Sequence, residues 1–115
     1  MPESQRRANV RYNLELLVKV KWTDTSGDEK EETGTTKNIS SSGAFMICSS
    51  EIRTGAPVDL EIELPITLAG RVTRSYVSAT GRVVRHVPLT GPFQGHGYAV
   101  AFDRYRFLRS ESSAL

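Results

Sequence analysis

Three arginines stand close together near the start of the chain, in a pattern suited to binding a small anion. They are Arg6, Arg7 and Arg11, within the stretch RRANVR. Arg7 and Arg11 are four positions apart, so they share a side whether the segment is helical or extended. A guanidinium group donates paired hydrogen bonds to phosphate oxygens, and its flat face stacks on a base. Taken alone, a solvated basic terminus explains the same cluster.

A second polar group, NISSSG at residues 38–43, lies between a polar segment and the apolar run AFMIC. Asn38 and Ser40 offer hydrogen-bond donors and acceptors at short reach, which is what the edge of a purine base requires. Gly43 lets the backbone turn sharply or approach a ligand closely. Taken alone, an ordinary turn between two strands explains this group equally well.

Nothing in the sequence marks a catalytic or metal-binding constellation. His86, His96 and the single cysteine, Cys48, lack the spacing of a zinc site, and no G-x-S-x-G nucleophile elbow is present. The acids of DLEIELP, residues 59–65, alternate along an expected strand, which is typical of a solvated face. We therefore expect a binding protein and not an enzyme, with no metal and no cofactor other than its ligand.

Length and composition indicate one soluble domain. The chain has 115 residues, of which 38% are hydrophobic and 24% charged, enough to bury a single core. No apolar run approaches the roughly 18 residues of a membrane-spanning helix, and the start lacks the apolar stretch of a signal peptide. We therefore expect a cytoplasmic protein without membrane insertion. The lone Cys48 is expected to be a small core residue.

Period-two alternation predicts an all-β fold. Leu16, Val18, Val20 and Trp22 share one face of the first expected strand. Further strands are expected at 33–39, 43–49, 58–64, 72–87 (one bent strand, or two joined at a bulge) and 98–103. Residues 23–32 should form a solvated connection, and Pro65 should end the fourth strand. Six or so short strands favour a small antiparallel barrel, because closure removes exposed edges.

The expected organisation is a single domain over residues 1–115. Residues 1–13 form an N-terminal ligand-binding arm, and residues 14–103 form the barrel. Residues 104–115 form a short helix and a polar tail, with Asp103 capping the helix.

The two polar groups together resemble the paired motifs of PilZ domains, R-x-x-x-R and [D/N]-x-S-x-x-G. They stand here as RANVR, Arg7 to Arg11, and NISSSG, Asn38 to Gly43, in the same order and with no position missing. The later segments GRVVRHV and HGYAVAFD also look like the family's last strands. The resemblance covers nearly the whole chain.

The resemblance implies a six-stranded antiparallel barrel of the split-barrel type that binds the bacterial second messenger cyclic di-GMP. Carried over by position, Arg7 and Arg11 hold phosphate and stack on guanine, while Arg6 assists. Asn38 and Ser40 read a guanine edge or reach phosphate, Gly43 allows the approach, and Arg85 contributes from a neighbouring strand. The family's longer C-terminal helix has no counterpart here, because little chain follows Phe107. This departure leaves either an uncapped barrel end or a homodimer.

We expect the arm to be loose without ligand, to fold over the barrel when cyclic di-GMP neutralises its arginines, and then to present a surface to an unidentified downstream protein. Two alternatives stay open. One is a ligand-free PilZ-like module that makes protein contacts only. The other is a small barrel that binds single-stranded nucleic acid, which would need aromatic and basic residues interleaved on a sheet face. Trp22 and Phe45 are isolated in core-like positions, and the acidic run at 28–32 would repel a strand, so we expect no nucleic acid partner.

Overall fold

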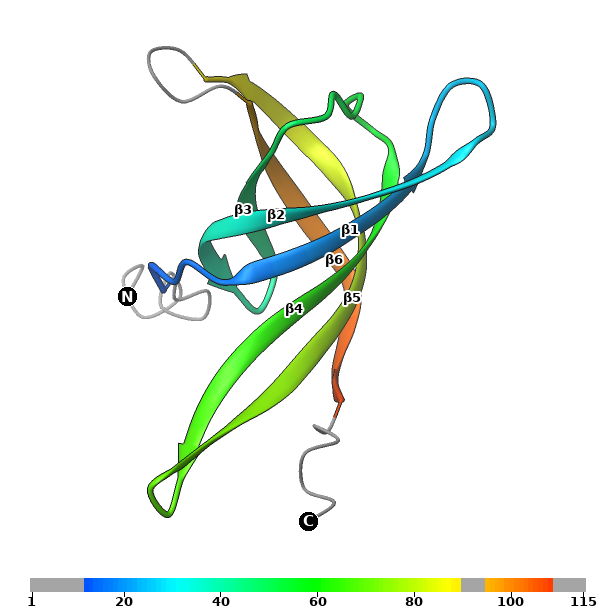
Figure 1. Cartoon of the computed structure of the whole chain (residues 1–115). Helices are drawn as coiled ribbons and strands as arrows, with labels where there is room; N and C mark the ends of the chain where they lie inside the picture. The colour runs from blue at the N-terminus through cyan, green and yellow to red at the C-terminus, as the bar shows by residue number, and fades with distance from the viewer. Residues whose placement is uncertain (1–11, 90–94, 109–115) are drawn as a thin grey trace, which may run out of the picture.

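The computed structural model describes residues 12–89 and 95–108, and these form six β-strands. Every neighbouring pair is antiparallel, and the ring closes where β1 pairs with β4, which gives a closed barrel of strand order β1-β2-β3-β6-β5-β4 (Figure 1). The predicted small antiparallel barrel is therefore confirmed. The strands are β1 (Leu17–Thr23), β2 (Glu29–Ser40), β3 (Gly43–Cys48), β4 (Pro57–Leu68), β5 (Arg71–Pro88) and β6 (His96–Leu108).

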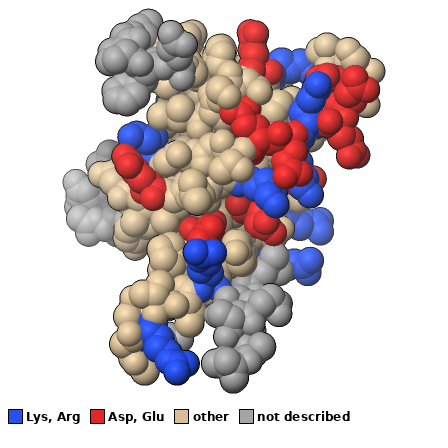
Figure 2. All heavy atoms as spheres, viewed as in Figure 1, with Lys and Arg blue, Asp and Glu red and all other residues tan. Residues whose placement is uncertain are grey.

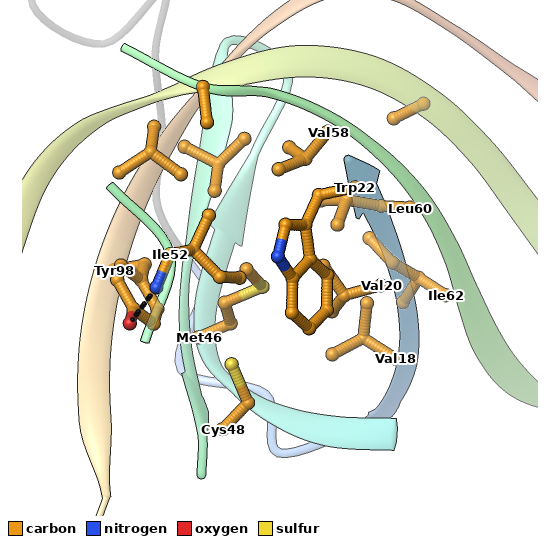
Figure 3. Packing of buried hydrophobic residues seen from close by; sticks show 14 of the residues in the cluster. Val18, Val20, Trp22, Met46, Cys48, Ile52, Val58, Leu60, Ile62 and Tyr98 are labelled. Carbon is orange, nitrogen blue, oxygen red and sulfur yellow. Dashed lines mark hydrogen bonds between the residues drawn. The ribbon is translucent and has the colours of Figure 1, made fainter. Parts of the chain in front are cut away.

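The core lies inside this ring, and the alternating residues identified in the sequence form much of it. In β1, Val18, Val20 and Trp22 are buried while the residues between them are exposed. β4 repeats the pattern with Val58, Leu60 and Ile62. Figure 3 shows these side chains packed against those of the opposite strands, including Met46 and Tyr98.

Cys48 belongs to the same core, as predicted. Its side chain is buried, and burial raises the pKa of the thiol to about 12.

No helix in the described part of the chain is long and apolar enough to cross a bilayer.

β2 and β4 are longer than predicted. β2 begins at Glu29, so the acidic run expected to be a connection is mostly strand and pairs with β1; Lys21, for example, lies opposite Glu31. β4 continues through Pro65 to Leu68. The described β1–β4 pairing stops at Ile62, so Pro65 lies on an open edge, where its missing N–H breaks no ladder on the β1 side.

The predicted C-terminal helix is wrong for residues 104–108. β6 extends to Leu108, and Arg104 to Leu108 pair with Thr80 to Tyr76 of β5. Asp103 is no helix cap but the extra residue of a β-bulge, since Phe102 lies opposite Gly81 and Arg104 opposite Thr80. Pairing with a strand some thirty residues earlier decides the conformation here. The barrel therefore extends past the predicted boundary at residue 103, and residues 109–115 lie outside the described residues.

Candidate functional site

A β-bulge at Lys37 sets the direction of the Asn38–Gly43 motif. Thr36 lies opposite Met46, but Asn38 lies opposite Phe45, so Lys37 is an extra residue in the β2–β3 ladder. Thr36 and Met46 are buried. Without the extra residue, Asn38 would share the inward face with Thr36; with it, Asn38 and Ser40 face outward.

The turn between β2 and β3 is held by its own serines and by β6. Ser40 lies opposite Gly43, which leaves Ser41 and Ser42 as the two exposed central residues. The Ser40 hydroxyl accepts a hydrogen bond from the backbone N–H of Ser42, at 3.2 Å. The backbone N–H of Phe102 donates to the carbonyl of Ser42, at 2.9 Å. The turn is therefore fixed to the neighbouring strand β6.

Gly43 is required by strand packing. It lies opposite Ala101 of β6, and a Cβ added at residue 43 would collide with the carbonyl oxygen of Val100. Its φ is not among the positive values found in the described residues. The close approach that Gly43 permits is therefore to the backbone of β6, within the barrel wall.

The segment that follows the arginine cluster runs alongside β2 and ends at the motif. Tyr12 and Ile39 exchange two backbone hydrogen bonds, of 2.9 and 3.0 Å, and Ile39 stands between Asn38 and Ser40. In Figure 1 this blue lead-in, residues 12–16, passes beside β2. Arg6, Arg7 and Arg11 themselves lie outside the described residues.

The buried hydroxyl of Thr36 attaches the lead-in to β2 from inside. It accepts a hydrogen bond from the backbone N–H of Leu16, at 3.0 Å, and donates one to the carbonyl of Leu14, at 2.6 Å. Sequence reasoning missed this residue. Thr36 stands in a threonine-rich stretch, and nothing in its neighbours distinguishes it from Thr33 or Thr35.

Two rows of outward-facing residues join the motif to β5 across β3 and β6. Strand pairing aligns the first row as Asn38, Phe45, Ala99 and Arg85. It aligns the second row as Ser40, Gly43, Ala101 and Arg82. The motif therefore borders a floor that holds the Phe45 ring beside the small residues Ala99 and Ala101, with two exposed arginines on the far side.

A second bulge places both arginines on that face. Val83 lies opposite Val100 and Arg85 lies opposite Ala99, so Val84 is the extra residue. Without it, Arg82 and Arg85, three positions apart, would point to opposite faces. Sequence reasoning named Arg85 but missed Arg82 for this reason. Phe45, expected in a core-like position, is instead half-buried on this outer face, with its ring over Gly97.

Charge is divided unevenly around the barrel. The described part of residues 71–108 holds six arginines and one acidic residue, whereas residues 12–70 hold ten acidic and five basic residues. Figure 2 shows acidic side chains gathered at the upper right, over the hairpin between β1 and β2. The two lysines of β1 lie among carboxylates; Lys19 is 3.8 Å from Glu31 and 3.9 Å from Glu61. An anionic ligand is therefore favoured on the β5–β6 side.

A sizeable hollow lies away from the motif. It has a volume of about 530 Å³ and lies over β1, β2 and the start of β4, where Glu29, Glu31 and Asp59 line it. These three carboxylates outnumber the two lysines that also line the hollow, Lys21 and Lys30, which disfavours a phosphate-bearing ligand. We therefore take the rows beside the motif, and not this hollow, as the candidate site.

The two histidines contact each other at the other end of the barrel. Nε2 of His86 lies 2.8 Å from Nδ1 of His96, and the ring of His86 stacks on Tyr98. Among the described residues, no group of three or more His, Cys, Asp or Glu is arranged to hold a metal ion.

A comparison with solved structures finds a protein of similar fold. The Bacillus subtilis inhibitor of motility, MotI/DgrA, superposes with a TM-score of 0.67 at 18% identity; the match covers 89% of this chain but only 44% of that protein. The PilZ domain of CeSA from a cellulose-synthesizing bacterium matches with a TM-score of 0.47 at 21% identity, over 80% of this chain and 79% of that one. No curated protein sequence matches. The sequence model of the PilZ domain matches residues 5–107. Since that match spans most of the chain, the protein belongs to the PilZ domain family.

Proposed function

We propose that this protein binds cyclic di-GMP on the outer face of the barrel, between its N-terminal arginines and the Asn38–Gly43 motif. Its role would be that of a receptor, without a chemical reaction of its own. Membership of the PilZ family supports the class of ligand, and the distribution of charge supports the side of the barrel on which a polyanion binds.

One observation carries the proposal: the Tyr12–Ile39 backbone pair. Arg11 directly precedes Tyr12 in the sequence, and consecutive Cα atoms are about 3.8 Å apart. Ile39 is flanked by Asn38 and Ser40. The first described residue, Tyr12, therefore lies beside the motif, and this supports a site in which groups from both motifs bind one small ligand.

Different residue types would bind different parts of the ligand. Arg7 and Arg11 would bind phosphate and stack on guanine, with Arg6 assisting. Asn38 and Ser40 would bind a guanine edge or a phosphate oxygen. Gly43 would act indirectly, by holding the turn against β6.

The small residues of the floor, Ala99 and Ala101, would let a flat ring approach the sheet. Arg85, together with Arg82, lies about three strand spacings from the motif, roughly 14 Å. A long side chain there would reach the far phosphate of a dinucleotide.

Ligand binding would be transmitted through the arm. Three clustered arginines repel one another, and two phosphates would remove that repulsion and let the arm fold onto the barrel. The reordered arm would then present a new surface to a downstream protein, or to a second copy of this chain.

Titration calorimetry with cyclic di-GMP tests the proposal. A charge-assisted hydrogen bond is worth roughly 1.5–3 kcal/mol, so Arg11→Ala should weaken binding at least about tenfold. Arg53→Ala is the matched control, because Arg53 is exposed in the connection at the other end of the barrel. GTP and cyclic di-AMP should bind much more weakly than cyclic di-GMP.

The alternatives predict different titrations. No binding of the wild-type protein would favour a ligand-free interaction module. Salt-dependent binding of oligonucleotides, with no preference for the cyclic dinucleotide, would favour a nucleic-acid-binding barrel. Unchanged affinity in Arg11→Ala would contradict the role assigned to the arm.

A further inference from the structure

Thr36 stands out because it is the one polar residue that is buried among the described residues; its exposed fraction is 0%. Three hydrogen bonds join it to the lead-in. Its backbone N–H donates to the carbonyl of Leu16, at 2.8 Å, and its hydroxyl bonds to Leu16 N–H and to the Leu14 carbonyl. Placing a hydroxyl in a core costs free energy unless both its donor and its acceptor are used, and here both are used.

Apart from Leu16, which packs against the hydrophobic core, the other contacts of residues 12–16 are weak. The ion pair between Lys37 Nζ and Glu15 Oε2, at 2.7 Å, joins two exposed side chains, and exposed pairs contribute little. Tyr12 and Leu14 leave much of their side-chain surface exposed. The Tyr12–Ile39 pair forms the outer end of the attachment, and the Thr36 hydroxyl forms its buried end.

Thr36 also directly precedes the bulge that turns the motif outward. It is the last inward-facing residue of β2 before Lys37, and Asn38 follows. A single side chain therefore lies between the segment that leads to the arginines and the segment that presents Asn38 and Ser40.

We infer that Thr36 is a positioning residue for the ligand site. Its hydroxyl sets the register at which the arm leaves the barrel, and so brings Arg11 and the Asn38–Ser40 pair to the same ligand. This inference rests on the proposed function for the identity of that ligand, cyclic di-GMP. The attachment itself can be tested without ligand.

The test compares Thr36→Val, which keeps the shape but removes the hydroxyl, with Thr36→Ser, which keeps the hydroxyl. Thr33→Val is the matched control, because Thr33 is an exposed threonine of the same strand. Two quantities are measured: the affinity for cyclic di-GMP by calorimetry, and the hydrogen exchange of the Tyr12 and Ile39 amides. Thr36→Val should speed exchange at both amides and weaken binding, each by about tenfold, the ratio that one such hydrogen bond represents. Thr36→Ser and Thr33→Val should stay close to wild type.

Two outcomes separate this inference from the proposed function. If Thr36→Val exchanges faster but binds as tightly as wild type, the positioning role is overturned while the proposed function stands. If the wild-type protein does not bind cyclic di-GMP, the proposed function fails. Hydrogen exchange that is unchanged in Thr36→Val would overturn the attachment, whether or not the protein binds cyclic di-GMP.

A second variant covers the case in which Thr36→Val does not fold. Tyr12→Pro removes the N–H that bonds to Ile39 from the solvent side and leaves the core intact. Affinity unchanged in Tyr12→Pro would overturn the inference, and a loss of about tenfold, without loss of thermal stability, would support it.

Discussion

The two ends of the barrel hold their loops in different ways. At the turn end, which comprises the Ser40–Gly43 turn, the serine hydroxyls bond within the turn itself, a backbone bond from Phe102 ties the turn to β6, and the motif side chains face outward. At the loop end, which comprises residues 49–56, side chains reach into the connection. The hydroxyl of Tyr98 donates to the carbonyl of Ser50 and accepts from the N–H of Ile52.

This difference suggests that the loop end contributes mainly to stability and the turn end mainly to ligand binding. The Tyr98 side chain is fully buried, and the dashed line in Figure 3 joins its hydroxyl to Ile52 within the core. Asn38 and Ser40 lie on the outer face, where their loss removes few buried contacts. Changes at the loop end should therefore reduce stability and spare affinity, and changes at the turn end should do the reverse.

The largest effect is expected at the loop end, for Tyr98→Phe. Loss of the hydroxyl leaves the Ser50 carbonyl and the Ile52 N–H without their partner, and an unpaired buried group costs roughly 1–3 kcal/mol. We expect the free energy of unfolding to fall by about 2–4 kcal/mol, as measured by urea denaturation. Affinity for cyclic di-GMP should stay within about twofold of wild type once binding is measured well below the unfolding transition. Tyr76→Phe, at a half-buried tyrosine of β5, is the control, and an equal loss there would contradict the assignment.

Gly43 belongs to the motif, but its packing against β6 means that its replacement should reduce stability, unlike other changes at the turn end. Gly43→Ala tests this exception. The added methyl group meets the Val100 carbonyl, and overpacking of this kind costs about 1–3 kcal/mol. Ser40→Ala, by contrast, should cost less than about 1 kcal/mol of stability but weaken binding of cyclic di-GMP. Thermal unfolding and calorimetry on both variants check this, with the exposed Ser41→Ala as control. If Gly43→Ala is fully stable but does not bind, Gly43 contacts the ligand directly and our reading of its packing is wrong.

The barrel can be predicted from the sequence because buried residues recur at a short, regular interval within each strand. The inward residues of β1 and β4 recur every second position, and that period is visible without knowledge of any neighbour. The short strand β3 was found in the same way, as an apolar run that ends at Cys48. Burial of apolar side chains determines these strands, and the apolar pattern is visible within the sequence of each strand.

The sequence does not predict the features that shape the site, because they depend on partners distant in the chain. The bulges at Lys37 and Val84 consist of ordinary residues and appear only in the register with β3 and β6. The hydroxyl of Thr36 bonds to residues some twenty positions earlier. Similarly, residues 104–108 have no local preference strong enough to distinguish a helix from a strand, and pairing with β5 decides. The roles assigned to Arg6, Arg7 and Arg11 stay predictions.

The smallest expected effect concerns pH and lies at the loop end. Glu32 accepts hydrogen bonds from the backbone N–H groups of Ser49 and Ser50 and from the Ser49 hydroxyl. Burial raises the pKa of the Glu32 carboxyl, but the hydrogen bonds from Ser49 and Ser50 outweigh burial, so its pKa lies below the ordinary value of 4.5.

A pKa lowered by folding means that the folded state binds this proton less readily than the unfolded state. The stabilisation from Glu32 is therefore complete above about pH 4.5 and is lost as the pH falls through the folded-state pKa. Because the carboxylate is partly solvated, its contribution should stay below about 1 kcal/mol. Urea denaturation of wild type and Glu32→Gln between pH 7 and pH 3 should show a stability difference that shrinks on acidification, with the exposed Glu29→Gln as control. A difference that grows at low pH would mean that the carboxylate is not what holds the connection, and the contrast between the two ends would then rest on Tyr98 alone.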